Sequence, residues 1–540
     1  MKKEKECFVL KKEITGLAIW QKDFLEKCFE AGRQISNAIK GKKLDDYNKM
    51  ISLSEYMETK QKCREIRKKL EKDKENKELQ KELKAQYAIL NEIYGQYGFY
   101  KMAFLSKDIY GEHLEKYSKY LDAGIIQSVA EDVWTSYEKL LYGEGKKVHF
   151  IKFGNFSSLR ARTNNSFLRY NLENDTIVIG RRNGEVHKQN KKNGTNKFTG
   201  QLIINIPRNF KDDFETKAFK EHNIKYCILK REYIRKKIKY YLEIVFDGIS
   251  PNAEKMKQQW NGVGTLGIDV GVQHLATYND RTLEANMFEI AEDCNNPHKR
   301  IAEIRRKMDR SRRGTNQQQF NKDGTINKGK KCKIRSNHYK KLLLELKELY
   351  RKPAAKRKLY WESLSKKMVL ESENIFIEDE SYKIWQERFK EGKGKKKKKK
   401  HYGCYIENKA PSEGVELIKR KSNYVGIPMK KIGVNTVKAT QYNHLTDSFD
   451  TDKKLTDRWN HDKRDTQRDL TSAMYITCIK DDKIDKKIVK RKWNDFKNSH
   501  NELINQIIEE NKNGKLLLGA MGIQQRYPNI SLKSNNINAH

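Results

Sequence analysis

The sequence predicts a multidomain α+β protein in which a β-barrel, interrupted by a helical region, precedes a mixed α/β domain. Three observations predict this. Residues 16–145 show helical spacing, residues 146–260 form short alternating runs typical of strands, and strands and helices are mixed from residue 261. A strand-like run at the start of the chain lets residues 1–15 complete the barrel of 146–260. A sandwich is the alternative for this β region.

The charge of the chain points to a polyanionic partner. Its 540 residues hold 113 Lys and Arg against 72 Asp and Glu, a formal net charge of +41. Such an excess repels itself unless a polyanion neutralises it, and binding to phosphates also releases counterions. Codon bias towards Lys, Ile and Asn does not by itself produce this imbalance against acids. ATPase chemistry is disfavoured because the sequence has no G-x-x-x-x-G-K-[ST] loop.

The sequence carries no sign of export or membrane insertion. No stretch approaches the roughly 20 apolar residues of a membrane helix, and no secretory signal is visible. The eight cysteines never form a C-x-x-C pair, which indicates reduced, structural thiols. We expect a prokaryotic cytoplasmic protein with no membrane partner, associated with the nucleoid when it binds DNA.

The helical and β regions contain further features. Residues 65–87 mix charges at helical spacing and predict an exposed helix or hairpin. The aromatic cluster that follows predicts core packing, with base stacking as the alternative; it comprises Tyr94, Tyr97, Phe99, Tyr100 and Phe104. Five strands are predicted in the β region, at 148–153, 176–179, 201–206, 226–231 and 239–246, with turns at 182–184 and 192–194.

Two segments later in the chain are expected to lack regular structure. The lysine run 395–400 predicts a mobile loop, with phosphate contact as a second role. Residues 527–540 are polar and predict a disordered tail.

The first candidate catalytic residue is Asp269. In a strand the side chains alternate between two faces, so one face carries Leu266, Ile268 and Val270, and the other carries Gly267, Asp269 and Gly271. The acid then stands between two glycines, which leaves room for a metal ion and a phosphate. Strands over 272–278 and near 285–290 would complete a meander. The G-x-D-x-G pattern also occurs in sugar kinases and ATPases of related fold.

The second candidate is Glu378. It follows a helix over 338–371, expected to break near Pro353, and a run at 375–377 that is apolar on both faces and so predicts an internal strand. Glu378 ends that strand, where open α/β sheets place their sites. Asp379 points to the opposite face and is the local competitor.

The third candidate is Asp469, in the first turns of a predicted helix. Asp469, Ala473 and Ile476 share one helix face. The two apolar residues would pack on the sheet, which points Asp469 at the sheet edge. Asp465 and Asp462 are its rivals.

Three converging acids suit phosphodiester hydrolysis. Two divalent ions about 4 Å apart can activate water and stabilise the leaving oxygen. Mg²⁺ prefers carboxylate ligands, and Mn²⁺ can substitute for it. Asp269 would bridge both ions, while Glu378 and Asp469 would each hold one.

At these acids the chain resembles the TnpB family of RNA-guided nucleases and the compact type V CRISPR effectors. The matching motifs are GIDVG at 267–271, IFIED at 375–379 and RDLTSA at 468–473. The family's third motif reads R-D-x-N-A-A, from which Thr471 and Ser472 depart conservatively. The resemblance implies an RNase H-like (RuvC) nuclease domain over 261–435 and 460–526, with Gly267, Gly271 and Arg468 in supporting roles.

The same resemblance implies the identity of the other domains. The chain also departs from the family in one respect. Residues 1–15 and 146–260 would form a wedge-like barrel, and 16–145 a helical recognition lobe. Family members often carry a zinc ribbon between the second and third motifs, but no cysteine lies between Cys404 and Cys478. Residues 436–459 are then a cysteine-free remnant of the target-strand-loading subdomain. Since His444 and His461 stand alone, we predict no structural zinc.

The implied function is RNA-guided, Mg²⁺-dependent cleavage of DNA at a single RuvC-like site. The partners would be a guide RNA, either a crRNA or a transposon-derived RNA, and double-stranded DNA with a short flanking motif. A homodimer on one RNA is possible. One alternative is a non-cleaving RNA-guided repressor. Another is a resolvase or transposase of the same fold that acts without RNA.

Overall fold

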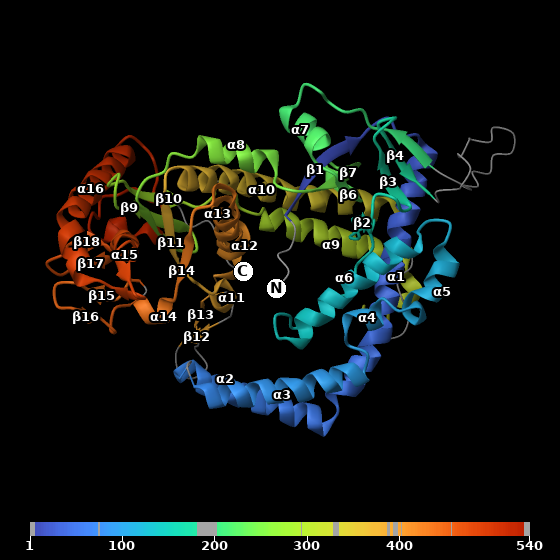
Figure 1. Cartoon of the computed structure of the whole chain (residues 1–540), viewed down its shortest axis with the longest axis horizontal. Helices are drawn as coiled ribbons and strands as arrows, with labels where there is room; N and C mark the ends of the chain where they lie inside the picture. The colour runs from blue at the N-terminus through green and yellow to red at the C-terminus, as the bar shows by residue number, and fades with distance from the viewer. Residues whose placement is uncertain are drawn as a thin grey trace. The chain divides into compact units, whose positions relative to one another are not determined.

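The computed structural model divides the chain into two compact units, Met1–Pro251 and Asn252–His540. It describes residues 6–73, 76–180, 202–292, 294–327, 334–385, 389–391, 398–400, 402–454 and 456–533 (Figure 1). The division falls at the start of helix α8 (Pro251–Gln259), a few residues before the boundary predicted at 260. None of the helices in this described part combines the length and apolar character needed to cross a membrane.

The first unit contains the predicted helical region. Its helices are α1 (Ile19–Ile51), α2 (Ser54–Lys72), α3 (Lys77–Gln96), α4 (Lys101–Phe104), α5 (Lys107–Tyr117), α6 (Ala123–Leu141) and α7 (Asp213–Glu221). The hairpin predicted for residues 65–87 is confirmed, because α2 and α3 pack side by side (Figure 1). Core packing is confirmed for Tyr94, Phe99 and Phe104, which are buried, and both phenylalanines contact Tyr137 of α6. It is not confirmed for Tyr100, which is half exposed.

The strands of the first unit form two sheets. The four-stranded sheet has the order β1-β7-β6-β2, from β1 (Cys7–Ile14), β2 (Ser158–Arg160), β6 (Ile224–Ile234) and β7 (Lys237–Asp247). The three-stranded sheet contains β3 (Leu168–Asn171), β4 (Thr176–Ile179) and β5 (Leu202–Asn205). The opening strand β1 pairs with β7, as predicted, across the helical insertion. The two sheets do not join into a closed barrel within the described residues, so the predicted barrel is not confirmed.

The prediction of a strand at residues 148–153 is wrong. Side chains of α1 form hydrogen bonds with the backbone N–H and C=O groups of this segment. A neighbouring strand would otherwise supply these bonds. Asn37 donates to the carbonyl of Ile151 at 2.9 Å and accepts from its N–H at 2.8 Å, and Lys40 donates to the carbonyl of His149 at 3.2 Å. Backbone groups satisfied in this way need no strand partner. The turns predicted at 182–184 and 192–194 lie outside the described residues.

The second unit is built on a five-stranded mixed sheet in the order β10-β9-β8-β11-β14. Its strands are β8 (Thr265–Val270), β9 (His274–Asn279), β10 (Ala285–Glu289), β11 (Asn374–Glu378) and β14 (Met429–Ile432). The first three form the predicted antiparallel meander. β11 runs parallel to β8, and β14 runs parallel to β11.

Helices cover both faces of this sheet. After α8, the helices of this unit are α9 (His298–Thr315), α10 (Asn337–Leu370), α11 (Tyr382–Trp385), α12 (Gly403–Lys409), α13 (Pro411–Val425), α14 (Val434–Val437), α15 (Arg468–Ile476) and α16 (Lys486–Lys512). On one face Ile268 shares a core with Trp361 of α10 and with α13. On the other face Ala276 shares a core with α15 and with Phe496 of α16. Short two-residue strands form three further hairpins: β15 (Tyr442–Asn443) with β16 (Ser448–Phe449), β17 (Trp459–Asn460) with β18 (Thr466–Gln467), and β19 (Ile479–Lys480) with β20 (Lys483–Ile484).

Three local predictions for this unit need correction. Helix α10 runs through Pro353 without a break; Pro353 is buried, and packing of the helix offsets the lost hydrogen bond. Residues 398–400 form β13 (Lys398–Lys400), paired with β12 (Phe389–Glu391), where a loop was predicted. The predicted disordered tail is wrong up to Lys533, whose N–H donates to the carbonyl of Leu517 at 2.8 Å. Residues 395–397 and 534–540 lie outside the described part.

Candidate active site

Asp269 and Glu378 lie side by side on neighbouring strands. In the parallel pairing of β8 with β11, Ile268 is the partner of Ile377, and each acid is the next residue along its strand. Adjacent strands are about 4.8 Å apart. Both isoleucines belong to the core beneath α10 and α13. Because side chains alternate along a strand, the two acids point to the other face, which α15 covers. The alternation predicted for β8 is thus confirmed.

Helix α15 brings Asp469 to this face of the sheet. The helix begins at Arg468, and the side chain of Gln467 caps it by accepting from the N–H of Leu470 at 2.8 Å. Asp469 therefore lies in the first turn, as predicted. The helix residues Leu470, Ala473 and Met474 are fully buried in the core of this face.

Gly267 and Gly271 allow close approaches of backbone. A Cβ on Gly267 would lie 2.0 Å from the carbonyl oxygen of Ala473 in α15, and one on Gly271 would lie 2.8 Å from the carbonyl oxygen of His274 in β9. The prediction that these glycines leave room for a metal ion and a phosphate is therefore wrong. They admit the helix and the hairpin strand that position the acids.

We expect Gly267→Ala to lower the free energy of unfolding by about 1–3 kcal/mol, because α15 would have to move away from β8. Urea denaturation measures this loss. Gly314→Ala is the matched control, since nothing lies within 4 Å of a Cβ at that helical position and alanine favours helix there. Equal urea midpoints for the two variants would show that the close approach of α15 to β8 does not contribute to stability.

Asp469 is buried among cationic and polar donors. His274 lies 2.9 Å from its Oδ2, Arg458 Nη1 lies 3.1 Å from the same oxygen, and Arg468 donates to Oδ1 from Nε and Nη2 at 3.0 Å each. Burial alone would raise the pKa of Asp469, but the hydrogen bond with His274 and the charges of Arg468 and Arg458 outweigh burial and lower it. Asp469 is therefore a firmly ionised carboxylate.

Asp269 and Glu378 have the opposite environment. Their exposed fractions are 9% and 7%, and Asp269 Oδ2 and Glu378 Oε1 have no hydrogen-bond partner among the described residues. Burial, and then the charge of Asp469, raise the pKa of Asp269 to about 7. Burial, and then the charge of Asp269, raise the pKa of Glu378 well above its ordinary value. The three acids are therefore close enough to influence each other's ionisation.

Two of these acids fit a divalent cation. Hard cations bind carboxylate oxygens, and Asp269 and Glu378 each offer a buried oxygen without a hydrogen-bond partner as a ligand. Asp469 differs, because cationic side chains already occupy its oxygens. In the described part of the chain no group of three or more His, Cys, Asp or Glu side chains is arranged to hold a metal ion. The binding of two Mg²⁺ ions stays a prediction.

The rivals of the predicted acids lie elsewhere. Asp379 is mostly exposed and pairs with Lys431 at 3.3 Å, Asp462 pairs with Arg464, and Asp465 pairs with Arg526. The charge of Asp469 raises the pKa of both Asp269 and Glu378.

Sequence reasoning missed two of the contacts of Asp469. His274 could have been found, because the β8–β9 register places it opposite Gly271, on the same face as Asp269. No pattern in the sequence indicated that Arg458 would contact Asp469. Arg458 comes from residues 436–459, which were predicted only as a remnant of the zinc-ribbon position.

The two histidines of the zinc-ribbon region have separate structural settings. His444 is buried, packs against Trp493 in a tilted arrangement with ring centroids 4.1 Å apart, and lies 2.9 Å from the hydroxyl of Tyr475. It is therefore a core residue. His461 is exposed. The absence of structural zinc stays a prediction.

Solved structures similar to this chain include two cryo-EM complexes. One, a cryo-EM structure of the Cas12f1-sgRNA-target DNA complex, is 14% identical, with 88% of this chain and 99% of that chain covered and a TM-score of 0.41. The other, a cryo-EM structure of a CRISPR-Cas12f ternary complex, is 15% identical, with 87% and 98% covered and a TM-score of 0.24. No family model and no curated protein matches the chain.

Proposed function

We propose that the chain is an RNA-guided DNA endonuclease with a single Mg²⁺-dependent, RuvC-like site. The observation that carries the proposal is the pair Asp269 and Glu378. These acids lie on adjacent strands, face the helix that carries Asp469, and each keep a buried oxygen without a partner. Burial of two adjacent charged carboxylates destabilises the folded protein unless a cation or a proton neutralises their charge.

The residues of the site have distinct roles in this proposal. When bound, Mg²⁺ would supply the positive charge that activates water and stabilises the leaving oxygen of the phosphodiester. Asp269 and Glu378 would hold the ions. Arg468 fixes the carboxylate of Asp469 through two hydrogen bonds, and His274 fixes its other oxygen from β9. The carboxylate of Asp469 is thereby kept ionised and oriented toward the acid pair.

The proposed partners follow from charge and from the resemblance of the three motifs. A net charge of +41 requires a polyanion, and guide RNA with a DNA target supplies one. By the resemblance, base pairing would read the target, and the protein would read a short flanking motif. A homodimer on one RNA remains open to test by mass measurement of the complex.

One observation favours a non-cleaving, DNA-binding repressor as the second candidate. Asp469 already accepts hydrogen bonds from Arg458 and Arg468, so it must release at least one of them to hold a metal ion. A cleavage assay separates the two candidates. The protein is purified with RNA from its native locus and mixed with plasmids that carry the target beside a randomised flanking sequence. Cutting in Mg²⁺ but not in EDTA supports the nuclease, whereas binding without cutting supports the repressor.

Arg458 provides a separate prediction. We expect Arg458→Ala to destabilise the metal-free protein by about 1–2 kcal/mol, because buried Asp469 loses one of its cationic partners. Added Mg²⁺ should close this deficit, since a bound cation replaces the lost charge. Thermal unfolding with EDTA and with Mg²⁺ measures both effects, and Arg310→Ala, an exposed arginine of α9, is the control. A deficit unchanged by Mg²⁺ would contradict the prediction.

A further inference from the structure

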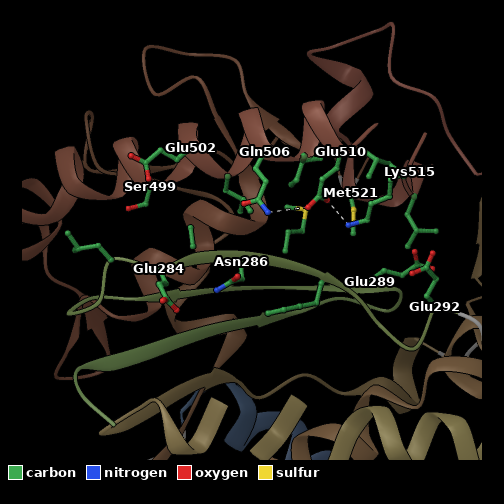
Figure 2. A pocket seen from close by; sticks show the side chains of 18 of the residues that line it. Glu284, Asn286, Glu289, Glu292, Ser499, Glu502, Gln506, Glu510, Lys515 and Met521 are labelled. Carbon is green, nitrogen blue, oxygen red and sulfur yellow. Dashed lines mark hydrogen bonds and ion pairs between the residues drawn. The ribbon is translucent and has the colours of Figure 1, made fainter. Parts of the chain in front are cut away.

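The second unit contains a groove of about 790 Å³ between strand β10 and helix α16. Figure 2 shows Glu284 and Asn286 on the strand side, and Glu502 and Gln506 on the helix side. The segment around Lys515 closes one end. No residue of the proposed catalytic set lines this groove.

The strand side of the groove is an open sheet edge. Among the described strands, β10 is the last of its sheet and pairs only with β9. The carbonyl of Glu284 accepts from Asn279 and the N–H of Ile290 donates to Gln273, so even-numbered residues of β10 point their backbone groups at β9. Ala285 and Met287 therefore direct their N–H and C=O groups away from β9. No backbone partner faces them on that side in the described part of the chain.

One end of the groove already binds ammonium groups. Lys533 Nζ lies 2.6 Å from Glu289 and also pairs with Glu292, and Lys515 Nζ lies 2.6 Å from Glu510. These contacts show that the acidic walls of the groove can hold lysine side chains.

The other end of the groove carries acids without cations. Glu284, Asp495 and Glu502 line it, are exposed, and form no ion pair within the described residues. In a chain of net charge +41, a cluster of unpaired acids repels nucleic acid and attracts a cationic group.

We propose that this groove binds an extended, lysine-rich segment of another protein, which adds a strand to the open edge of β10. Backbone hydrogen bonds to Ala285 and Met287 would supply the pairing, as in other cases of strand addition at a sheet edge. Alternate lysines of the segment would pair with Glu284 and Glu502 on the two walls. The proposal does not depend on the nuclease function, because none of these residues belongs to the candidate active site.

The test uses a fluorescent peptide of about ten residues in which lysine alternates with threonine, a length that covers a typical strand. Its binding to the full-length, nucleic-acid-free protein is measured by fluorescence anisotropy. We expect the double variant Glu284→Gln, Glu502→Gln to weaken binding about fivefold, the effect of losing two exposed ion pairs. Glu416→Gln, an exposed acid of α13 outside the groove, should leave binding unchanged.

A second peptide separates strand pairing from simple charge attraction. It has the same sequence, with an N-methyl group on every residue, which removes the N–H donors of both edges but leaves the charge. We expect it to bind at least about tenfold more weakly, since the pairing with β10 is lost. Equal binding of both peptides, or equal binding by the double variant and the wild type, overturns the proposal. Self-association of the protein that the double variant abolishes also overturns it, by assigning the groove to a second copy.

Discussion

Asp269→Asn is expected to reduce DNA cleavage by at least about 10³-fold while guide RNA and target DNA still bind. Asp269 stands between Glu378 on β11 and the helix that carries Asp469, and its Oδ2 is buried without a partner. Asparagine keeps the shape of the side chain but removes the charge that would hold a cation. Cleavage rates under single-turnover conditions and gel-shift affinities measure the two properties separately.

Asp379→Asn is the matched control for this experiment. Asp379 directly follows Glu378 but is mostly exposed and pairs with Lys431. Its loss should change the cleavage rate less than about twofold, the scale of one exposed ion pair. Comparable cleavage by Asp269→Asn and by the wild type would remove Asp269 from the active site.

The contribution of Asp269 to the stability of the metal-free protein is expected to fall as the pH rises from about 4 to about 7. The pKa of Asp269 is about 7 in the folded protein and about 3.9 in an unfolded chain. Between these values the folded protein keeps a proton that the unfolded chain has released, so its stability falls with rising pH. Asp469 has a lowered pKa, and its contribution changes only at more acidic pH. Asp269→Asn removes the cost of burying the charged carboxylate and should stabilise the protein at pH 8 by about 4 kcal/mol.

Urea denaturation in EDTA tests this at pH 4.5 and at pH 8. The variant should gain over the wild type at pH 8, and the gain should shrink at pH 4.5. Asp379→Asn should show no such dependence on pH. A gain for Asp269→Asn that is the same at both pH values would mean that burial of the charged carboxylate is not what destabilises the wild type.

The local part of the site could be predicted from sequence because it depends on periodicity. Alternation along β8 placed Asp269 on the face opposite Ile268, and helical spacing placed Asp469 on the face of Ala473. Glu378 was identified because it ends an apolar run. Each prediction uses only a few neighbouring residues.

Other features depend on contacts between distant segments and could not be predicted in this way. The pairing of β8 with β11 juxtaposes Asp269 and Glu378, and no local pattern specifies it. Arg458 reaches Asp469 because the β17–β18 hairpin folds beside α15. The segment at 148–153 has a strand-like sequence, but Asn37 of α1 takes its backbone hydrogen bonds. Pro353 predicted a break that the packing of α10 prevents.

The most direct test of the central claim is electron paramagnetic resonance of Mn²⁺ bound to the complex of protein, guide RNA and target DNA. Two ions about 4 Å apart between Asp269, Glu378 and Asp469 would show spin–spin coupling. We expect the coupled signal in the wild type and in Asp379→Asn, and its loss in Asp269→Asn and in Glu378→Gln. An unchanged signal in the last two variants would contradict the claim that these carboxylates hold the catalytic metal ions.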